Sequence, residues 1–339
     1  MTSSKTPNSL SGKRVSVSGA DGFIGSHLVE RLVENGAHVR AMVFYNSFGR
    51  RGWLDDCPDA TLKKIEIVAG DIRDARQMRD FVSGTEYLFH LASLIAIPYS
   101  YQAVESYVET NIRGTMNLLE ASREHKITRF VHTSTSEVYG SAQTTPMNEE
   151  HPLSAQSPYA ATKIAADQLA LSYYRSYDLS LTVLRPFNTY GPRQSSRAVI
   201  PTIISQIAAG KTEISLGALH PMRDFLFIDD TIDAFIQCAT ATDTGGEVIH
   251  IGSGKVISIG QLAALISRLM NRTVKVTEAS ERLRPKQSEV DRLLCDHAKA
   301  SRLLNWHPCI GLESGLLKTI AWFSNPENLK LYAPDRYGI

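Results

Sequence analysis

The sequence has few cysteines, almost no net charge and no long apolar segment. Its four cysteines, Cys57, Cys238, Cys295 and Cys309, are far apart and match no metal-ligand spacing, so we expect separate thiols in a reducing compartment and no metal site. The formal net charge of +1 excludes a protein whose main partner is a nucleic acid. No stretch approaches the roughly 18 apolar residues of a membrane span, and the polar start, MTSSKTPNSLSGK, predicts a frayed tail rather than a secretory signal. We therefore expect a cytoplasmic protein without a membrane partner.

The chain does have the composition and rhythm of a globular α/β protein. Hydrophobic residues make up 43% and charged residues 21%, which predicts an ordinary packed core. Short apolar segments alternate with helical patterns between residues 14 and 188: RVSVSG, HVRAMVF, KIEIVAGD, TEYLFHLAS, RFVHTSTS and LTVLRPFN. This alternation predicts a Rossmann-like, doubly wound parallel sheet over residues 12–190. The looser pattern that follows predicts a smaller, partly discontinuous C-terminal α/β subdomain over residues 191–330, with the ligand in the cleft between the two.

A glycine-rich loop follows the first predicted strand. SVSGADGFIGSHL has glycines at 19, 22 and 25 between a strand and a helix, a position that suits the pyrophosphate of a dinucleotide. Asp71 in GDIRD is placed to meet the adenine, and Leu91 in HLAS to line the nicotinamide side. The residues assigned to the cofactor, besides Tyr159 and Lys163 discussed below, are Gly19, Gly22, Phe23, Ile24, Gly25, Asn46, Asp71, Ile72, Leu91, Ala92, Ser93 and Thr133.

The end of the second predicted strand does not match this picture well. NAD enzymes usually have an acidic residue there, which holds the ribose 2′-hydroxyl. The segment HVRAMVFYNSFGRR has Tyr45, Asn46 and Ser47 instead, followed by Arg50 and Arg51, which could pair with a 2′-phosphate. We expect NAD, and these two arginines leave NADP open.

Tyr159 and Lys163 lie four residues apart at the start of a predicted helix, in SPYAATKIAADQL. That spacing puts both side chains on one helix face. A nearby ammonium and the positive nicotinamide ring lower the pKa of a phenol, so the tyrosine can act as a base near neutral pH. Together with the glycine loop, this pair predicts a dehydrogenase-type site.

These motifs carry a family resemblance. The three glycines, Thr135, Tyr159-x-x-x-Lys163 and RPFNTYGPRQ resemble the extended short-chain dehydrogenase family that acts on nucleotide sugars, over about residues 12–325. The resemblance implies a nucleoside diphosphate sugar as substrate. It assigns the binding of that substrate to Asn188, Arg193, Val199, Arg223 and Arg284. Arginine suits a diphosphate because its planar guanidinium presents several donors.

Within that family, HTSTSEVYG looks like the sugar-nucleotide 4,6-dehydratases, which have an acid shortly after the catalytic threonine. The resemblance implies that Tyr159 takes the O4 proton, Thr135 hydrogen-bonds O4, Lys163 assists the tyrosine and Glu137 removes the C5 proton. Ser136 stands where some dehydratases have an acid that protonates the leaving C6 oxygen. Further segments look especially like NAD-dependent dehydratases of N-acetylglucosamine nucleotides, which supply legionaminic-acid-type and bacillosamine-type pathways: YNSFGRRGWLDD, SPYAATKIAADQLALSYYRSYDL and RPFNTYGPRQSSRAVIPTIISQ.

Three other functions remain open at this point. A UDP-glucuronate decarboxylase also has Thr-Ser-Glu, and Arg282 or Arg284 could hold its substrate carboxylate. A nucleotide-sugar 4-epimerase would not need an acid at position 137, so Glu137 argues against this function. A protein that only senses NAD(P) would not need Thr135, Tyr159 and Lys163. For assembly we expect a homodimer through two amphipathic segments, TNIRGTMNLLEASRE and QLALSYYRSY, as family members commonly form.

Overall fold

The computed structural model describes residues 10–332. The first nine residues of the expected N-terminal tail lie outside the described residues, and Leu10, next along the chain, is 1% exposed in the core. Among residues 10–332 no helix is both long and apolar enough to cross a membrane. In the same range no group of three or more His, Cys, Asp or Glu side chains could hold a metal ion.

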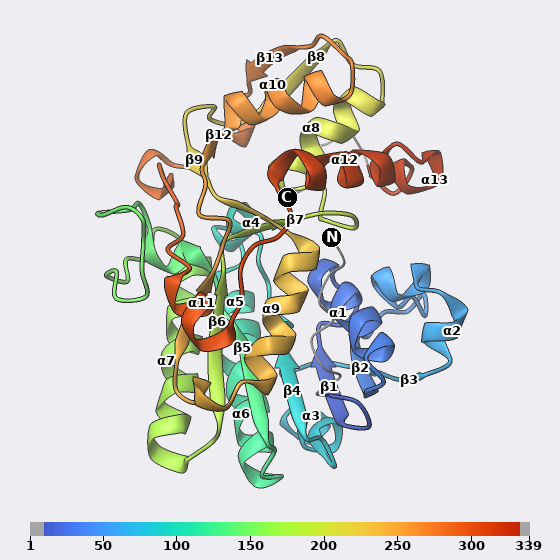
Figure 1. Ribbon diagram of the computed structural model, residues 1–339, viewed down its shortest axis with the longest axis vertical. Coiled ribbons are helices and arrows are strands. Elements are labelled where there is room, and N and C mark those ends of the chain that lie inside the picture. Colours follow the sequence, from blue (N-terminus) through green and yellow to red (C-terminus); the bar gives the residue numbers. More distant parts are fainter. Residues whose placement is uncertain (1–9, 333–339) are drawn as a thin grey trace.

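A parallel sheet forms the centre of the molecule (Figure 1). Its seven strands are β1 (Arg14–Ser18), β2 (His38–Phe44), β3 (Ile65–Gly70), β4 (Tyr87–His90), β5 (Arg129–Thr133), β6 (Leu181–Pro186) and β11 (Val248–Ile251). The order across the sheet is β11-β6-β5-β4-β1-β2-β3, and every pair is parallel. This confirms the predicted doubly wound Rossmann-like fold. The strand order reverses direction between β1 and β4, which is where such sheets bind ligands.

Helices cover both faces of the sheet. One face carries α1 (Phe23–Glu34), α9 (Ile228–Thr240) and α11 (Ala298–Leu304); the other carries α3 (Ala75–Val82), α6 (Gly114–Glu124) and α7 (Pro158–Tyr177). Neighbouring strand residues enter opposite cores: Phe89 packs with the α1 and α9 side, and Leu88 with the α3 and α6 side. The reason is that successive side chains of a strand point to opposite faces. Strand β6 is buried along its whole length, as expected for a parallel strand covered on both sides.

Shorter elements connect these layers. They are the 3₁₀ turns Gly52–Asp56 and Ser136–Tyr139, α2 (Asp59–Leu62), α4 (Ile97–Ser100), α5 (Val104–Tyr107) and the π-helical turn Val108–Arg113. Predicted strand segments 85–93 and 129–136 are longer than the strands observed. Their last residues leave the sheet, and all of these except Ser136 line the cavity described below.

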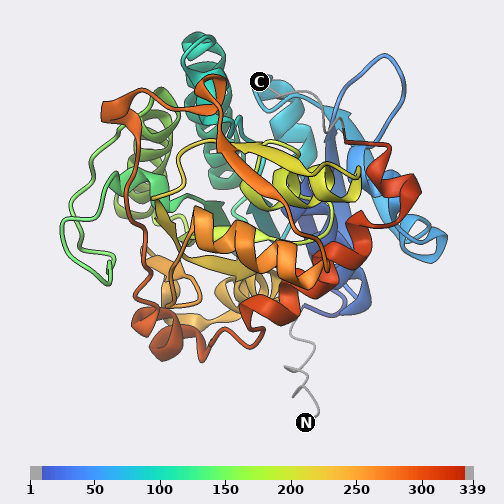
Figure 2. The same cartoon turned by 90° about the horizontal axis from the view of Figure 1, so that it is seen from above.

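The C-terminal part rises above the carboxyl ends of the strands, and Figure 2 shows it from above. It contains β7 (Asn188–Tyr190), α8 (Val199–Ala208), β8 (Glu213–Leu216), β9 (Met222–Arg223), β10 (Phe225–Phe227), β12 (Ile257–Ser258), α10 (Ile259–Leu269), β13 (Lys275–Glu278), α12 (Leu312–Phe323) and α13 (Pro326–Leu329), with 3₁₀ turns at Thr242–Thr244, Ser280–Arg282 and Lys286–Ser288. Its strands form three two-stranded pairs, β10-β7, β12-β9 and β13-β8. The chain crosses between the two parts repeatedly. The predicted second segment, 191–330, contributes α9, β11 and α11 to the first.

Candidate active site

A cavity of about 810 Å³ opens where β1, β4, β5 and β6 end, below the C-terminal part. It brings together seventeen of the residues predicted from the sequence: Gly19, Gly22, Phe23, Ile24, Gly25, Asp71, Ile72, Leu91, Ala92, Ser93, Thr133, Thr135, Glu137, Tyr159, Lys163, Asn188 and Arg284. Five others do not line it: Asn46, Ser136, Arg193, Val199 and Arg223. The predicted residues therefore converge on one cleft, with exceptions that have structural causes.

The glycine loop packs too closely against neighbouring backbone for side chains. Gly19 has φ +72°, and a Cβ atom there would lie 2.7 Å from the Ala92 amide nitrogen. A Cβ on Gly25 would come within 2.0 Å of the Gly19 carbonyl oxygen. Helix α1 begins after Gly22, and no side chain caps its first turn. An uncapped helix start beside a glycine turn is a ready anion site, so these residues suit a bound diphosphate.

Asn46 was predicted to meet the cofactor, but its side chain organises its own loop. Its Oδ1 atom accepts hydrogen bonds from the amides of Phe48 and Arg50, at 3.2 and 3.1 Å. Its Nδ2 atom donates to the Arg50 carbonyl at 2.7 Å. Short polar side chains commonly fold back on nearby backbone in this way, which is why the sequence pattern was misleading here.

Helix α7 positions the two central residues. Ser157 caps its start by accepting from the Ala160 amide at 3.1 Å, and Pro158 occupies the first turn. Tyr159 is 7% exposed and packs edge-on against Tyr107. Burial raises the pKa of Tyr159 well above its ordinary value, and a hydrogen bond with Thr135 opposes that shift. This direction is opposite to the lowering expected from Lys163, because burial disfavours the charged phenolate. The phenol thus lies in the cavity beside the threonine that the sequence paired with it.

Lys163 is held one turn further along α7. Its ammonium donates to the Thr133 carbonyl at 2.5 Å. Burial lowers the pKa of Lys163 to about 8, while the Asp167 carboxylate acts in the opposite direction. The lysine therefore ties α7 to the end of β5, on the wall of the cavity.

A buried polar network supports this arrangement from below. Asp167 is fully buried and accepts from Ser134 Oγ at 2.6 Å and from the Arg185 guanidinium at 2.7 Å. His132 Nε2 lies 3.1 Å from its other oxygen. Despite burial, the positive charge of Arg185 and the contact with His132 hold the pKa of Asp167 well below its usual range. The network joins α7, β5 and β6 directly behind the catalytic side chains.

The segment HTSTSEVYG continues from β5 into a 3₁₀ turn. Thr135 caps this turn by accepting from the Glu137 amide at 3.2 Å. Glu137 lines the cavity together with Thr135 and Tyr159. Ser136 is 3% exposed and does not line the cavity, because the turn directs alternate positions away from it. The acid, and not its serine neighbour, shares the cleft with the tyrosine.

Glu137 has a cationic partner from the far end of the chain. A guanidinium nitrogen of Arg284 lies 3.6 Å from the Glu137 carboxylate, and both side chains are largely buried. Arg223 lies behind this pair, bonded to Glu289 at 3.2 Å, and burial lowers its pKa. Arg223 therefore contributes positive potential near Glu137 without lining the cavity.

Arg193 and Val199 were assigned to the substrate, but the structure places them elsewhere. Arg193 makes a two-pronged ion pair with Glu30 of α1, at 2.9 and 3.1 Å, and is 9% exposed. It braces the C-terminal part against the cofactor helix. Val199 begins α8 and packs against the core, and its neighbour Ala198 lines the cavity instead. Asn188 does line the cavity and donates to the Asp224 carbonyl at 3.1 Å.

The cavity is also lined by residues that the sequence reasoning missed, three of which have polar or charged groups of interest. Asp21 lies within the glycine loop, and Gln194 and Arg197 follow the motif that ends in GPRQ. The Oε1 atom of Gln194 is buried without a hydrogen-bond partner. Arg197 is an exposed cation in the loop before α8. The signal available in the sequence was the charge at position 197, four residues after the arginine that was chosen.

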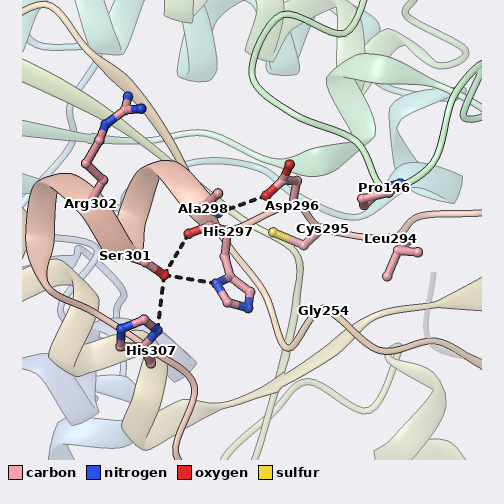
Figure 3. A pocket seen from close by; sticks show the side chains of 10 residues that line it. All are labelled: Pro146, Gly254, Leu294, Cys295, Asp296, His297, Ala298, Ser301, Arg302 and His307. Atoms are coloured by element: carbon pink, nitrogen blue, oxygen red, sulfur yellow. Dashed lines mark hydrogen bonds between the residues drawn. The ribbon is translucent and has the colours of Figure 1, made fainter.

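A second cavity, of about 890 Å³, lies around the start of α11 (Figure 3). Ser301 contacts the Nδ1 atoms of His297 and His307 there, at 3.2 and 3.1 Å. None of the residues predicted for cofactor, catalysis or substrate lines this cavity. It has no glycine loop and no tyrosine–lysine pair, so we assign the active site to the first cavity.

The fold, the glycine loop and the Thr135–Tyr159–Lys163 group define an NAD-dependent enzyme of the short-chain dehydrogenase/reductase type. The chain belongs to the family described as GDP-mannose 4,6 dehydratase, whose model matches residues 17–319.

Relatives within this family carry out more than one named activity. The chain is 34% identical over 319 residues to a UDP-glucose 4-epimerase of Mycolicibacterium smegmatis, covering 92% of this chain and 99% of the relative. It is 32% identical over 316 residues to a dTDP-glucose 4,6-dehydratase of Streptomyces niveus, covering 91% and 92%. The dTDP-glucose 4,6-dehydratase DesIV of Streptomyces venezuelae, solved with NAD bound, has TM-score 0.81 and 29% identity and covers 95% of this chain and 99% of its own. The comparisons establish the NAD-dependent sugar dehydratase and epimerase family.

Proposed function

We propose that this protein is a nucleotide-sugar 4,6-dehydratase that acts on UDP- or GDP-N-acetylglucosamine and forms the 4-keto-6-deoxy sugar. The observation that carries the proposal is the position of Glu137 in the same cavity as Thr135 and Tyr159. A 4-epimerase needs only the alcohol at C4 to be oxidised and reduced. A carboxylate in the cleft beside the catalytic tyrosine supplies a second base, which dehydration requires.

The chain's own groups account for each proton movement. The glycine loop would hold NAD, which when bound would supply the hydride acceptor and donor for C4 and C6, so that no net oxidation would occur. Tyr159 removes the O4 proton, with Thr135 as its hydrogen-bond partner and Lys163 fixed beside it. The ketone at C4 acidifies the C5 proton, and Glu137 removes it. The C6 hydroxyl then leaves as water, taking the proton that Glu137 has gained. As the hydride is returned to C6, C5 takes up a proton from solvent, and Tyr159 releases the O4 proton to solvent, so the net change is the loss of one water.

The contact with Arg284 supports Glu137 as that base. Arg284, 3.6 Å from the carboxylate, holds Glu137 in place on the cavity wall beside Thr135 and Tyr159. Because Ser136 is buried away from the cavity, Glu137 also carries the proton to the leaving oxygen. Asn188, Gln194, Arg197 and Arg284 are the polar residues of the C-terminal side that would meet the nucleotide sugar.

Two other activities have specific support. The 34% identity to a UDP-glucose 4-epimerase favours epimerisation. Arg284, beside Glu137, is also where a decarboxylase would hold a substrate carboxylate. Product masses separate the three. The protein is incubated with UDP- and GDP-N-acetylglucosamine, dTDP-glucose and UDP-glucuronate. We expect the N-acetylglucosamine nucleotide to lose one water. Loss of carbon dioxide from the glucuronate, or an unchanged mass with altered retention, would replace the dehydratase assignment.

We also propose that two copies associate through α6 and α7. Three side chains on these helices, Met116, Tyr174 and Tyr177, are 38%, 39% and 53% exposed. Apolar and aromatic groups in this position gain from burial against a second copy. Sedimentation should give the mass of a dimer, and Met116→Glu should shift it towards the monomer. A wild-type monomer at micromolar concentration would contradict the proposal.

A further inference from the structure

The cofactor side of the cavity has an acidic residue, Asp21, that does not come from the end of β2, where dinucleotide-binding folds usually have one. Strand β2 ends at Phe44, and no Asp or Glu follows before Asp55. In dinucleotide-binding folds the residue at this strand end usually recognises the ribose next to the adenine. Phe44 lines the cavity here, so the ribose end of the site is at this strand, but the strand supplies no carboxylate.

Asp21 reaches that place from the glycine loop. Its Oδ2 atom accepts a hydrogen bond from the Phe44 amide at 2.9 Å, which fixes the carboxylate at the end of β2. Asp21 lines the same cavity as Phe44 and as its neighbour Gly22. The acid is therefore beside the strand end that recognises the ribose, although it is more than twenty residues away in sequence.

The loop after β2 is built around this aspartate. The Trp53 amide donates to the Asp21 carbonyl at 3.0 Å. Gly52 has φ +58°, and a Cβ atom there would lie 2.4 Å from that carbonyl and 2.8 Å from the Asp21 Cβ. Only glycine permits this close approach, so the loop is shaped to lie against Asp21. The internal hydrogen bonds of Asn46 hold the rest of the loop in the same conformation.

Arg50 and Arg51, the two arginines that left NADP open, are not placed to bind a 2′-phosphate in this cavity. Arg51 is paired with Asp55 through its side chain at 2.7 Å and through its backbone amide at 3.0 Å. Neither Arg50 nor Arg51 lines the cavity. Asp21 does line it, and the other charged groups near this strand end that line it, Asp71 and Arg73, are paired with each other.

We propose that Asp21 is the specificity-determining residue for the cofactor: its carboxylate accepts the ribose hydroxyls of NAD and repels the 2′-phosphate of NADP. The chemistry is that of the acidic residue at the end of β2 in other dinucleotide sites, supplied from a different part of the chain. A carboxylate favours a neighbouring diol as an acceptor and disfavours a second anion within a few ångströms. The proposal concerns the cofactor alone, so it stands whichever sugar reaction the protein catalyses.

Calorimetric titration of the full-length protein with NAD and with NADP tests this directly. We expect wild-type protein to bind NAD more tightly than NADP by roughly 100-fold, and Asp21→Asn to reduce that ratio by about tenfold or more. Asparagine keeps the acceptor for the Phe44 amide, so the loop should remain folded. Asp21→Ser provides a second uncharged variant if asparagine disturbs the loop, with circular dichroism as the check on folding.

Asp71→Asn is the matched control, because Asp71 is another carboxylate on the cavity wall but is bonded to Arg73. It should change the affinities for both cofactors alike and leave their ratio unchanged. A wild-type ratio in folded Asp21→Asn or Asp21→Ser would overturn the proposal. So would a ratio that changes in the double variant Arg50→Ala, Arg51→Ala and not in Asp21→Asn.

Discussion

The two halves of the cleft are built in different ways. The cofactor half uses strand ends and the glycine loop, and its shape comes from close backbone approaches such as that of Gly19 to Ala92. The half proposed for the sugar joins β5 and its following turn to residues from much later in the chain, such as Asn188, Arg197 and Arg284. Its lining acid, Glu137, pairs with Arg284, and Arg223 pairs with Glu289 just outside the lining. The cofactor half is thus preformed, whereas binding of a charged substrate in the other half must exchange existing ion pairs.

The largest effect is expected for Tyr159→Phe, which tests the C4 oxidation common to dehydration, epimerisation and decarboxylation. Loss of the phenol hydroxyl removes the O4 base, so we expect the rate of C4 oxidation to fall about 10²–10⁴-fold with NAD binding retained. Stopped-flow absorbance of the reduced nicotinamide measures this step. Tyr107→Phe is the control, since that ring packs against Tyr159 and its hydroxyl donates to the Ala96 carbonyl. An equal loss in both variants would mean that packing, and not the hydroxyl, is responsible.

The support beneath the cleft can be tested through Asp167→Ala. We expect a loss of about 3–5 kcal/mol in the free energy of unfolding, because the buried Arg185 would be left without its carboxylate. The pKa of Asp167 is lowered in the folded state, so its contribution is present at neutral pH and is lost only as the pH falls through that low value. Denaturant unfolding measures both. Asp233→Ala removes the half-exposed partner of Arg31 and should cost about 1 kcal/mol or less.

Variants of Arg284 and Arg193 compare an arginine that lines the cavity with one that forms a structural ion pair outside it. We expect Arg284→Gln to raise the KM for the nucleotide sugar about tenfold or more, because a charge-assisted contact is lost. Arg193→Gln should leave KM nearly unchanged and lower the thermal midpoint, because its partner is Glu30. Steady-state kinetics and thermal unfolding give the two readouts. A large KM effect from Arg193→Gln would return that residue to the substrate site.

The smallest effect expected is a pH dependence from Lys163. Its pKa is lowered to about 8, so the ammonium is present below that pH and is lost as the pH rises through it. C4 oxidation should therefore decline on the alkaline side near pH 8, and Lys163→Met should lack that decline. The pKa values of His90 and His132 are lowered by burial, so both are neutral throughout this range. A decline that persists in Lys163→Met would assign it to another group.

Sequence reasoning was most successful where function depends on local geometry. The glycine loop and the Tyr159–Lys163 pair are fixed by turn and helix spacing, and all of them line the cavity. It was less successful where a side chain has a choice of partners. Arg193 has the chemistry of a diphosphate ligand, but Glu30 is 163 positions away and its proximity cannot be read from the sequence. Asn46 turned to its own backbone, and Asp21 was overlooked because its role depends on the separate strand β2.

The central claim is that Glu137 removes the C5 proton. The most direct measurement is deuterium incorporation at C5 of the nucleotide sugar in heavy water, followed by mass spectrometry for wild type, Glu137→Gln and the control Ser136→Ala. We predict incorporation by wild type and Ser136→Ala, and a loss of about 10²–10⁴-fold in Glu137→Gln with C4 oxidation retained. Incorporation by Glu137→Gln at the wild-type rate would contradict the account.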